Sequence, residues 1–83
     1  MQRDVIFQDK ERTLTAGLSA EIDHHTARRI RERIDAELFL KKPEILVLDF
    51  SGVGFMDSSG LGLILGRVDK AAMTGAFVEV RGL

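Results

Sequence analysis

Ile45-Leu46-Val47-Leu48-Asp49-Phe50 is the stretch that decides the fold, because it is an almost unbroken apolar run of strand length. Runs of this kind belong to strands that are covered on both faces. We therefore predict a β-strand at the centre of a sheet, with both of its faces buried.

A helix is predicted before this strand, from Ala27 to about Leu40. Its buried stripe repeats every four residues and consists of Ile30, Ile34 and Leu38. Asp23 or Thr26 can cap its start, and Pro43 cannot continue it. The lysines Lys41-Lys42 suit the negative pole at its end.

The opposite face of this helix is charged. Three basic–acidic pairs lie four residues apart on it: Arg28–Glu32, Arg31–Asp35 and Arg33–Glu37. Clustered arginines could indicate nucleic-acid binding, but the interleaved acids favour a solvated face that binds no nucleic acid. The formal charge of −1 also leaves no global field to draw the chain to nucleic acid or to a membrane.

Two strands are predicted near the N-terminus. Val5-Ile6-Phe7 is a short β-favouring run, closed by the polar turn Gln8–Glu11. Thr13–Leu18 alternates apolar and other residues with a period of two, which is typical of a half-buried strand. We expect the two to pair as a hairpin.

A second helix is predicted after the central strand, opened by Asp57-Ser58-Ser59-Gly60 and running to about Met73. One face of it carries Leu61, Leu65, Val68 and Ala72. Ala76–Val80 then forms a last strand. The order β-β-α-β-α-β predicts an α/β fold, a mixed sheet with helices packed against it, in a single domain over residues 1–83.

Composition narrows the class of protein. Hydrophobic residues make up 45% of the chain and charged residues 30%, which is ordinary globular composition. The absence of cysteine excludes disulfides, thiol catalysis and thiolate metal sites. We find no signal peptide and no apolar run long enough to span a membrane, and therefore expect a cytoplasmic location.

The serine pair at the start of the second helix is the most informative site. It follows the central strand, where α/β folds commonly place ligands, and the positive end of a helix favours an anion. Ser58 could cap the helix by accepting from the N–H of Gly60 or Leu61. It could also be a phosphorylation site. The two interpretations are compatible, since one hydroxyl can cap first and carry phosphate later.

Glycines within the second helix suggest a close approach. Gly62 and Gly66 lie one turn apart and make a flat stripe, to which the backbone of the domain's own sheet or of a partner could pack.

An enzyme is the main competing interpretation. Ser58 or Ser59 could be a nucleophile, with a histidine as base and a carboxylate as orienter: His24 or His25, and Asp23 or Asp57. The Gly-x-Ser-x-Gly motif would need glycine where Met56 stands, and the small domain leaves little room for a substrate pocket. His24-His25 lacks further ligands of evident spacing for a metal. We therefore expect no catalytic residue, no metal and no cofactor.

Two segments carry a resemblance to a known family. Phe55–Arg67, with its Met56-Asp57-Ser58-Ser59-Gly60-Leu61-Gly62 core, resembles the signature of the anti-sigma factor antagonists of the STAS domain family, in particular the sporulation-type antagonists that free sigma-F. Leu18–Ala27, with Asp23-His24-His25-Thr26, agrees independently. Together the two motifs are highly specific, and the resemblance spans nearly the whole chain.

The resemblance implies a switch in transcription regulation. The unmodified antagonist binds an anti-sigma factor that is also a serine kinase, and so releases the sigma factor. That kinase phosphorylates Ser58, which abolishes binding, and a serine phosphatase reverses the step. The resemblance places these residues in the partner surface: Asp23, Asp57, Ser58, Ser59, Gly60 and Gly62.

Two departures from the family pattern have consequences. Ala20 stands where many relatives have glycine. Relatives also continue past the strand matched by Phe77–Val80 into further helical structure, whereas this chain ends at Leu83. With that C-terminal helical element missing, we expect exposed apolar surface, and with it homodimerisation or low stability.

The same family includes stressosome scaffolds and cytoplasmic parts of anion transporters, which bind partners without a sigma-factor switch. Those forms are usually attached to an extra N-terminal domain or to membrane spans. A free-standing domain with an intact serine motif favours the antagonist.

Overall fold

The predicted order of strands and helices is confirmed by the computed structural model, which describes residues 4–83. Its elements are β1 (Val5–Lys10), β2 (Thr13–Leu18), α1 (His24–Lys41), β3 (Ile45–Asp49), α2 (Ser59–Thr74) and β4 (Phe77–Arg81). The strands form one mixed sheet in the order β1-β2-β3-β4, in which β1 and β2 are antiparallel and the other neighbours are parallel. β4 is the last element, and no helix follows it within the described residues.

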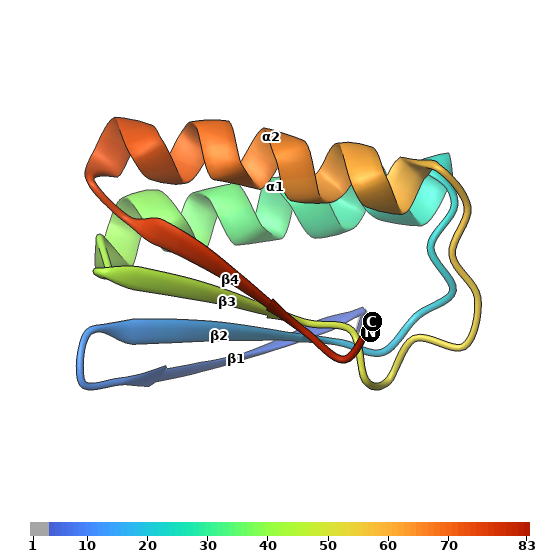
Figure 1. Cartoon of the computed structure of the whole chain (residues 1–83), viewed down its shortest axis with the longest axis horizontal. Coiled ribbons are helices and arrows are strands. Elements are labelled where there is room, and N and C mark those ends of the chain that lie inside the picture. The colour runs from blue at the N-terminus through green and yellow to red at the C-terminus, as the bar shows by residue number, and fades with distance from the viewer. Residues whose placement is uncertain (1–3) are drawn as a thin grey trace.

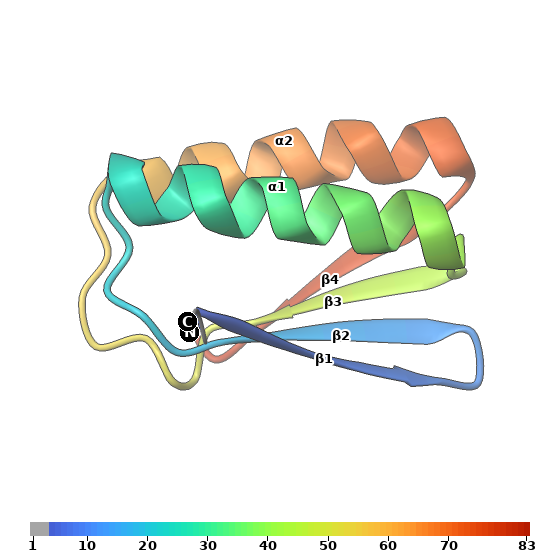
Figure 2. The ribbon, with the colours of Figure 1, turned by 180° about the vertical axis from the view of Figure 1, so that it is seen from behind.

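The prediction that β3 lies inside the sheet is confirmed. The prediction that other elements cover both of its faces is wrong. Both helices lie on the same face of the sheet (Figures 1 and 2). Leu46 and Leu48 point into the core beneath the helices, and Val47 points to the open face. Val47 is nevertheless only 1% exposed. Thr15 and Glu79 flank it in register on the neighbouring strands and shield it without a second layer.

The first hairpin forms as predicted, but the turn lies further along the chain. β1 continues through the polar residues to Lys10, which pairs with Thr13. The turn is made by Glu11 and Arg12, whose φ angles of 52° and 61° are in the left-handed region. β1 is an edge strand whose exposed face meets water, so it can contain polar residues. For this reason the polar residues Gln8–Lys10 belong to the strand and not to the turn.

α1 begins at His24, three residues earlier than predicted, because Asp23 is its N-cap. The Asp23 carboxylate accepts from the backbone N–H groups of His25 and Thr26 at 2.9 Å, and the Thr26 hydroxyl accepts from the Asp23 N–H. These bonds, chiefly the one from the Thr26 N–H, hold the pKa of Asp23 below its ordinary value of 3.8. The predicted stripe is confirmed, since its three residues are fully buried: Ile30, Ile34 and Leu38.

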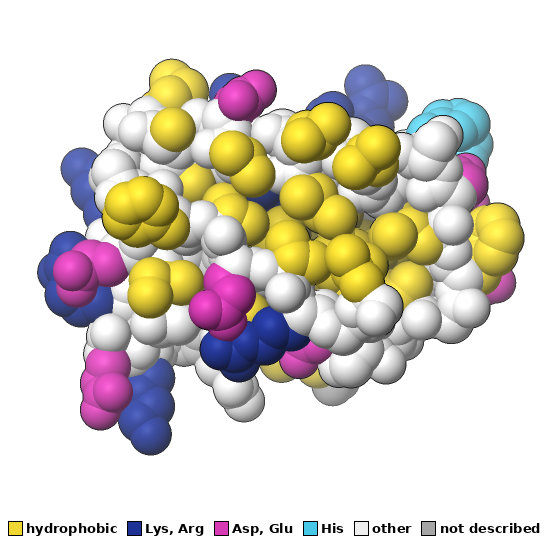
Figure 3. Space-filling model, viewed as in Figure 1, with side chains coloured by type: hydrophobic (Ala, Val, Ile, Leu, Met, Phe, Trp, Pro, Cys, Tyr) yellow, Lys and Arg dark blue, Asp and Glu magenta, His cyan; other side chains and the backbone are white. Residues whose placement is uncertain are grey.

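The face of α2 that packs is not the one predicted. Its buried positions are Gly60, Leu63, Arg67 and Ala71. The predicted apolar face is exposed instead, and its members are Leu61, Leu65, Val68 and Ala72. Figure 3 shows hydrophobic side chains gathered over α2 and β4. The expected exposure of apolar helix and sheet surface is thus confirmed, and Phe77 on β4, 78% exposed, belongs to it.

A buried arginine explains this orientation of α2. Arg67 is 2% exposed and lies against α1, where its Nε atom is 2.8 Å from a carboxylate oxygen of Asp35, without the alignment of a hydrogen bond. Burial lowers the pKa of Arg67, and the attraction of Asp35 opposes that shift. The pair of Arg67 and Asp35 thus joins α2 to α1 on the buried face of α2.

The three ion pairs predicted along α1 do not form among residues 4–83. Asp35 is engaged by Arg67 across the helix interface, so it is not left for Arg31. Arg33 lies over the Phe7 ring, 5.8 Å from its centroid, and Arg29 pairs with Asp4 at 2.9 Å. No helix in this part of the chain is long and apolar enough to cross a bilayer.

The orientation of α2 can be tested by truncating one leucine from each of its faces. Leu63→Ala should lower the free energy of unfolding by about 2–5 kcal/mol, because it leaves a cavity in the core. Leu65→Ala, at a position 57% exposed, should change it by less than about 0.5 kcal/mol. Urea unfolding followed by circular dichroism gives both values. The reverse order of effects would show that the predicted face packs after all.

The charge of the Asp23 cap gives a pH dependence. Because the folded-state pKa of Asp23 is lowered, the stabilisation it gives is present above about pH 4 and is lost as pH falls through the folded pKa. Asp23→Asn keeps a capping oxygen and removes the charge. The difference in unfolding midpoint between wild type and Asp23→Asn should therefore be largest at neutral pH and shrink below pH 4. A difference that stays constant down to pH 2 would contradict this account.

Candidate functional site

Two loops at one end of the sheet are tied together by backbone hydrogen bonds. The Ile22 N–H donates to the Phe55 carbonyl at 2.9 Å, and the Asp57 N–H donates to the Ile22 carbonyl at 3.0 Å. Ile22 and Met56 thereby form an isolated parallel bridge. Figures 1 and 2 show the two loops side by side where both helices begin. The bridge therefore brings together the Asp23 segment and the serine segment, which the sequence separates by more than thirty residues.

This bridge was missed in the sequence. Ile22 is fully buried although its neighbours Glu21 and Asp23 are polar. Ile22 and Met56 are each the last apolar residue before a helix, which is the signal that could have indicated the pairing.

Gly60 is buried against Met56. A Cβ atom at Gly60 would overlap the Met56 side chain, so the missing side chain makes the seat for this methionine. The other two glycines differ, because a Cβ atom at Gly62 or Gly66 would meet nothing within 4 Å. The interpretation that Gly62 and Gly66 approach the domain's own sheet is therefore wrong, and the stripe faces outward.

Asp57, rather than Ser58, caps α2. The Asp57 carboxylate accepts from the Ser59 N–H at 2.8 Å, and its carbonyl accepts from the Gly60 N–H at 3.0 Å. Ser58 already has helical backbone angles, φ −62° and ψ −14°, and its side chain makes no capping hydrogen bond. The prediction that Ser58 is the cap is therefore wrong. Because its neighbour does the capping, the exposed Ser58 hydroxyl is left available for other chemistry.

The two serines are presented differently. Ser58 is exposed, whereas Ser59 is partly buried and lines an open groove between the first turns of α1 and α2. The Ser58 side chain is therefore the more accessible of the two. A phosphate acceptor must be accessible to a kinase, and the exposed Ser58 side chain meets that requirement.

A nucleophile–base pair is not assembled among residues 4–83, where neither serine hydroxyl bonds to a histidine. His24 and His25 are exposed, with ring centroids 4.4 Å apart. Within the same residues, no three histidine or carboxylate side chains gather to hold a metal ion.

Curated proteins of similar sequence include anti-sigma F factor antagonists. An anti-sigma F factor antagonist of Paenibacillus polymyxa is 39% identical over 67 residues, which are 81% of this chain and 57% of the relative. The chain thus spans little more than half the length of that curated relative.

Solved structures of the anti-sigma factor antagonist SpoIIAA are also similar. Its unphosphorylated form matches with a TM-score of 0.74 and 30% identity, covering 92% of this chain and 70% of SpoIIAA. The phosphorylated form of SpoIIAA, a Bacillus cell fate determinant, matches with a TM-score of 0.71 and 29% identity, over 89% and 68% of the two chains.

The family itself follows from a match over almost the whole chain. The model of the STAS domain aligns with residues 4–83. The mixed sheet and its order of elements agree with that match. The chain belongs to the STAS domain family.

Proposed function

We propose that this domain is an anti-sigma factor antagonist that is switched by phosphorylation of Ser58. The unphosphorylated form binds an anti-sigma factor with serine kinase activity, which releases the sigma factor in the cytoplasm. Phosphorylation of Ser58 abolishes binding, and a serine phosphatase restores it. The observation that carries this proposal is the exposed Ser58 hydroxyl, left without a capping role beside Asp57. Similarity to SpoIIAA, which has been solved in both phosphorylation states, supports it.

In the proposed partner surface, each residue has a different task. Asp23 and Asp57 hold the two helix starts in place through their capping bonds, and the bridge between Ile22 and Met56 brings both starts to the same end of the molecule. Gly62 is exposed and gives a flat approach to α2. Gly60 is buried, so we assign it the seating of Met56 and not a direct contact.

The magnitude of the switch favours a direct block of the interface. Moving a partner from mostly bound to mostly free takes about 5.5 kcal/mol of differential affinity. The helix dipole contributes only about 0.3–1 kcal/mol to holding a phosphate. Burying an unpaired phosphate in an interface costs several kcal/mol, and the nearby Asp57 carboxylate adds repulsion. Phosphorylation therefore prevents docking without refolding the domain.

The proposal is tested by incubating the protein with the anti-sigma factor kinase of the same genome and ATP. Wild type and Ser59→Ala should each gain one phosphate, and Ser58→Ala should gain none, as measured by intact mass and peptide mapping. Modification of Ser59 in the wild type, or of neither serine, would contradict the proposal.

The block of the interface is tested by measuring binding of the same kinase to three forms. Ser58→Ala should bind as the wild type does, because the hydroxyl is not needed for docking. Ser58→Asp should bind at least about tenfold more weakly, and the phosphoprotein more weakly still. Equal binding of all three forms would exclude a direct electrostatic block.

A further inference from the structure

The groove beside the serine pair has one strongly basic wall. It lies between the N-terminal turns of the two helices and has a volume of about 480 Å³. His24, Arg28 and Arg31 of α1 line one side, and Ser59 and Gly62 of α2 line the other. Leu63 adds an apolar contribution to the lining. In Figure 3 the histidine and basic side chains appear behind α2 at the end where both helices begin.

The two arginines of this wall are not held in ion pairs. Arg28 and Arg31 are exposed and lie about one turn apart on α1. Neither forms an ion pair within residues 4–83, whereas Arg29 on the same helix is paired with Asp4. The acid one turn after Arg31 is Asp35, and Arg67 has taken it. The groove therefore presents two guanidinium groups with no internal partner.

We propose that this groove binds an acidic segment of the anti-sigma factor kinase while that partner docks on Ser58. The inference rests on the proposed function and names the chemistry of its partner. Charge complementarity carries it, since guanidinium groups bind carboxylates in a bidentate manner and two of them stand free on one wall. Ser59 lines the groove and directly follows Ser58, so a segment in the groove would lie next to the phosphorylated position.

Because Arg28 and Arg31 are exposed, replacing them should change the rate of association more than the rate of dissociation. Exposed charges contribute mainly to the rate of encounter and to its dependence on salt, because water and ions screen them once the complex has formed. Replacing them should therefore slow association more than it speeds dissociation.

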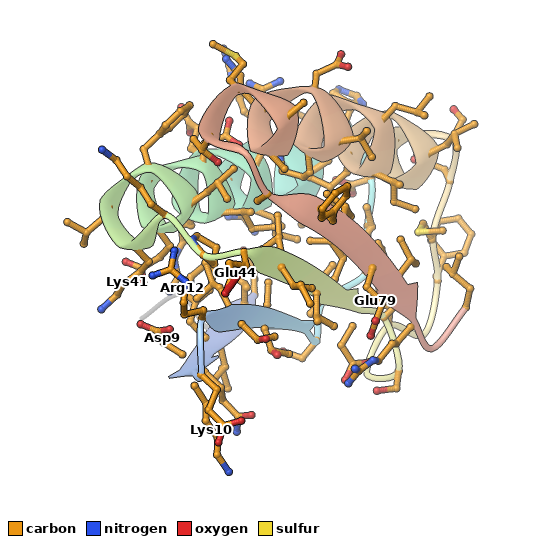
Figure 4. All side chains as sticks on the ribbon, turned by 60° about the vertical axis from the view of Figure 1, so that its left-hand side comes forward. Asp9, Lys10, Arg12, Lys41, Glu44 and Glu79 are labelled. Carbon is orange, nitrogen blue, oxygen red and sulfur yellow. The ribbon has the colours of Figure 1, made fainter. Side chains whose placement is uncertain are left out.

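The experiment compares charge reversals in the groove with a matched reversal elsewhere. Arg28→Glu and Arg31→Glu each change the net charge by two, as does Lys10→Glu. Lys10 lies at the hairpin end of the molecule, among the charged residues labelled in Figure 4, away from the helix starts. Association with the kinase is measured by stopped-flow fluorescence at several salt concentrations. Unfolding curves confirm that each variant folds, and Arg28→Gln and Arg31→Gln replace any variant that does not.

Each groove variant should associate about tenfold more slowly at low salt, with a shallower salt dependence, and Lys10→Glu should remain within about twofold of wild type. Groove variants that match Lys10→Glu would overturn the inference. So would phosphorylation kinetics in which kcat falls and KM is unchanged, since that result would place the arginines at the transferred phosphoryl group instead. A wild type that neither binds nor is phosphorylated would refute the proposed function itself, whereas a wild type that binds and variants that bind equally refute only the groove.

Discussion

The end of the molecule that carries the serine pair depends on one short piece of backbone pairing, the bridge between Ile22 and Met56. Two hydrogen bonds hold loops that follow different strands of the sheet. Ile22 is fully buried and Met56 is seated against Gly60, so the bridge is anchored in the core. Because each loop leads into a helix, the same pairing fixes where both helices begin. The Asp23 cap and the Asp57 cap are then brought to one edge of the domain.

The state of Ser58 follows from that arrangement. The hydroxyl of a serine at a helix start commonly accepts a capping hydrogen bond from the backbone, and this bond would compete with modification of the hydroxyl. Here Asp57 supplies the capping oxygen, and Ser58 stands one position further on with a free, exposed hydroxyl. In the proposed switch, a phosphate on Ser58 would meet the positive pole of α2 and the Asp57 carboxylate. The proposal therefore places the cost of phosphorylation in the complex with the partner and not in the free domain.

The sequence predicted those parts that a local pattern specifies. The alternation in β2 and the four-residue repeat of α1 each have only one way to bury their apolar side chains. The apolar run of β3 indicated the central position of the strand, but not that helices cover only one of its faces. The motif also indicated Ser58, whose role as the acceptor of phosphate stays a prediction. The face of α2 could not be predicted in the same way, because Leu61 and Leu65 compete with Leu63 and Ala71, and the face that packs includes a charged residue, Arg67, which lies beside Asp35. The capping side chain of α2 was predicted one residue too late, at Ser58 instead of Asp57, because aspartate and serine cap helices equally well. The bridge and the basic groove depend on tertiary contacts between distant segments.

The central claim, that a core-anchored bridge holds the Ser58 loop in place, is tested most directly by amide hydrogen exchange. The N–H groups of Ile22 and Asp57 should exchange at least about a hundredfold more slowly than that of Gly54. Gly54 lies in the same loop as Asp57, and its N–H donates to no acceptor in the described chain. The protection of both should persist after phosphorylation of Ser58. Exchange of Ile22 and Asp57 as fast as that of Gly54 would show that the two loops are not tied, and would contradict the account.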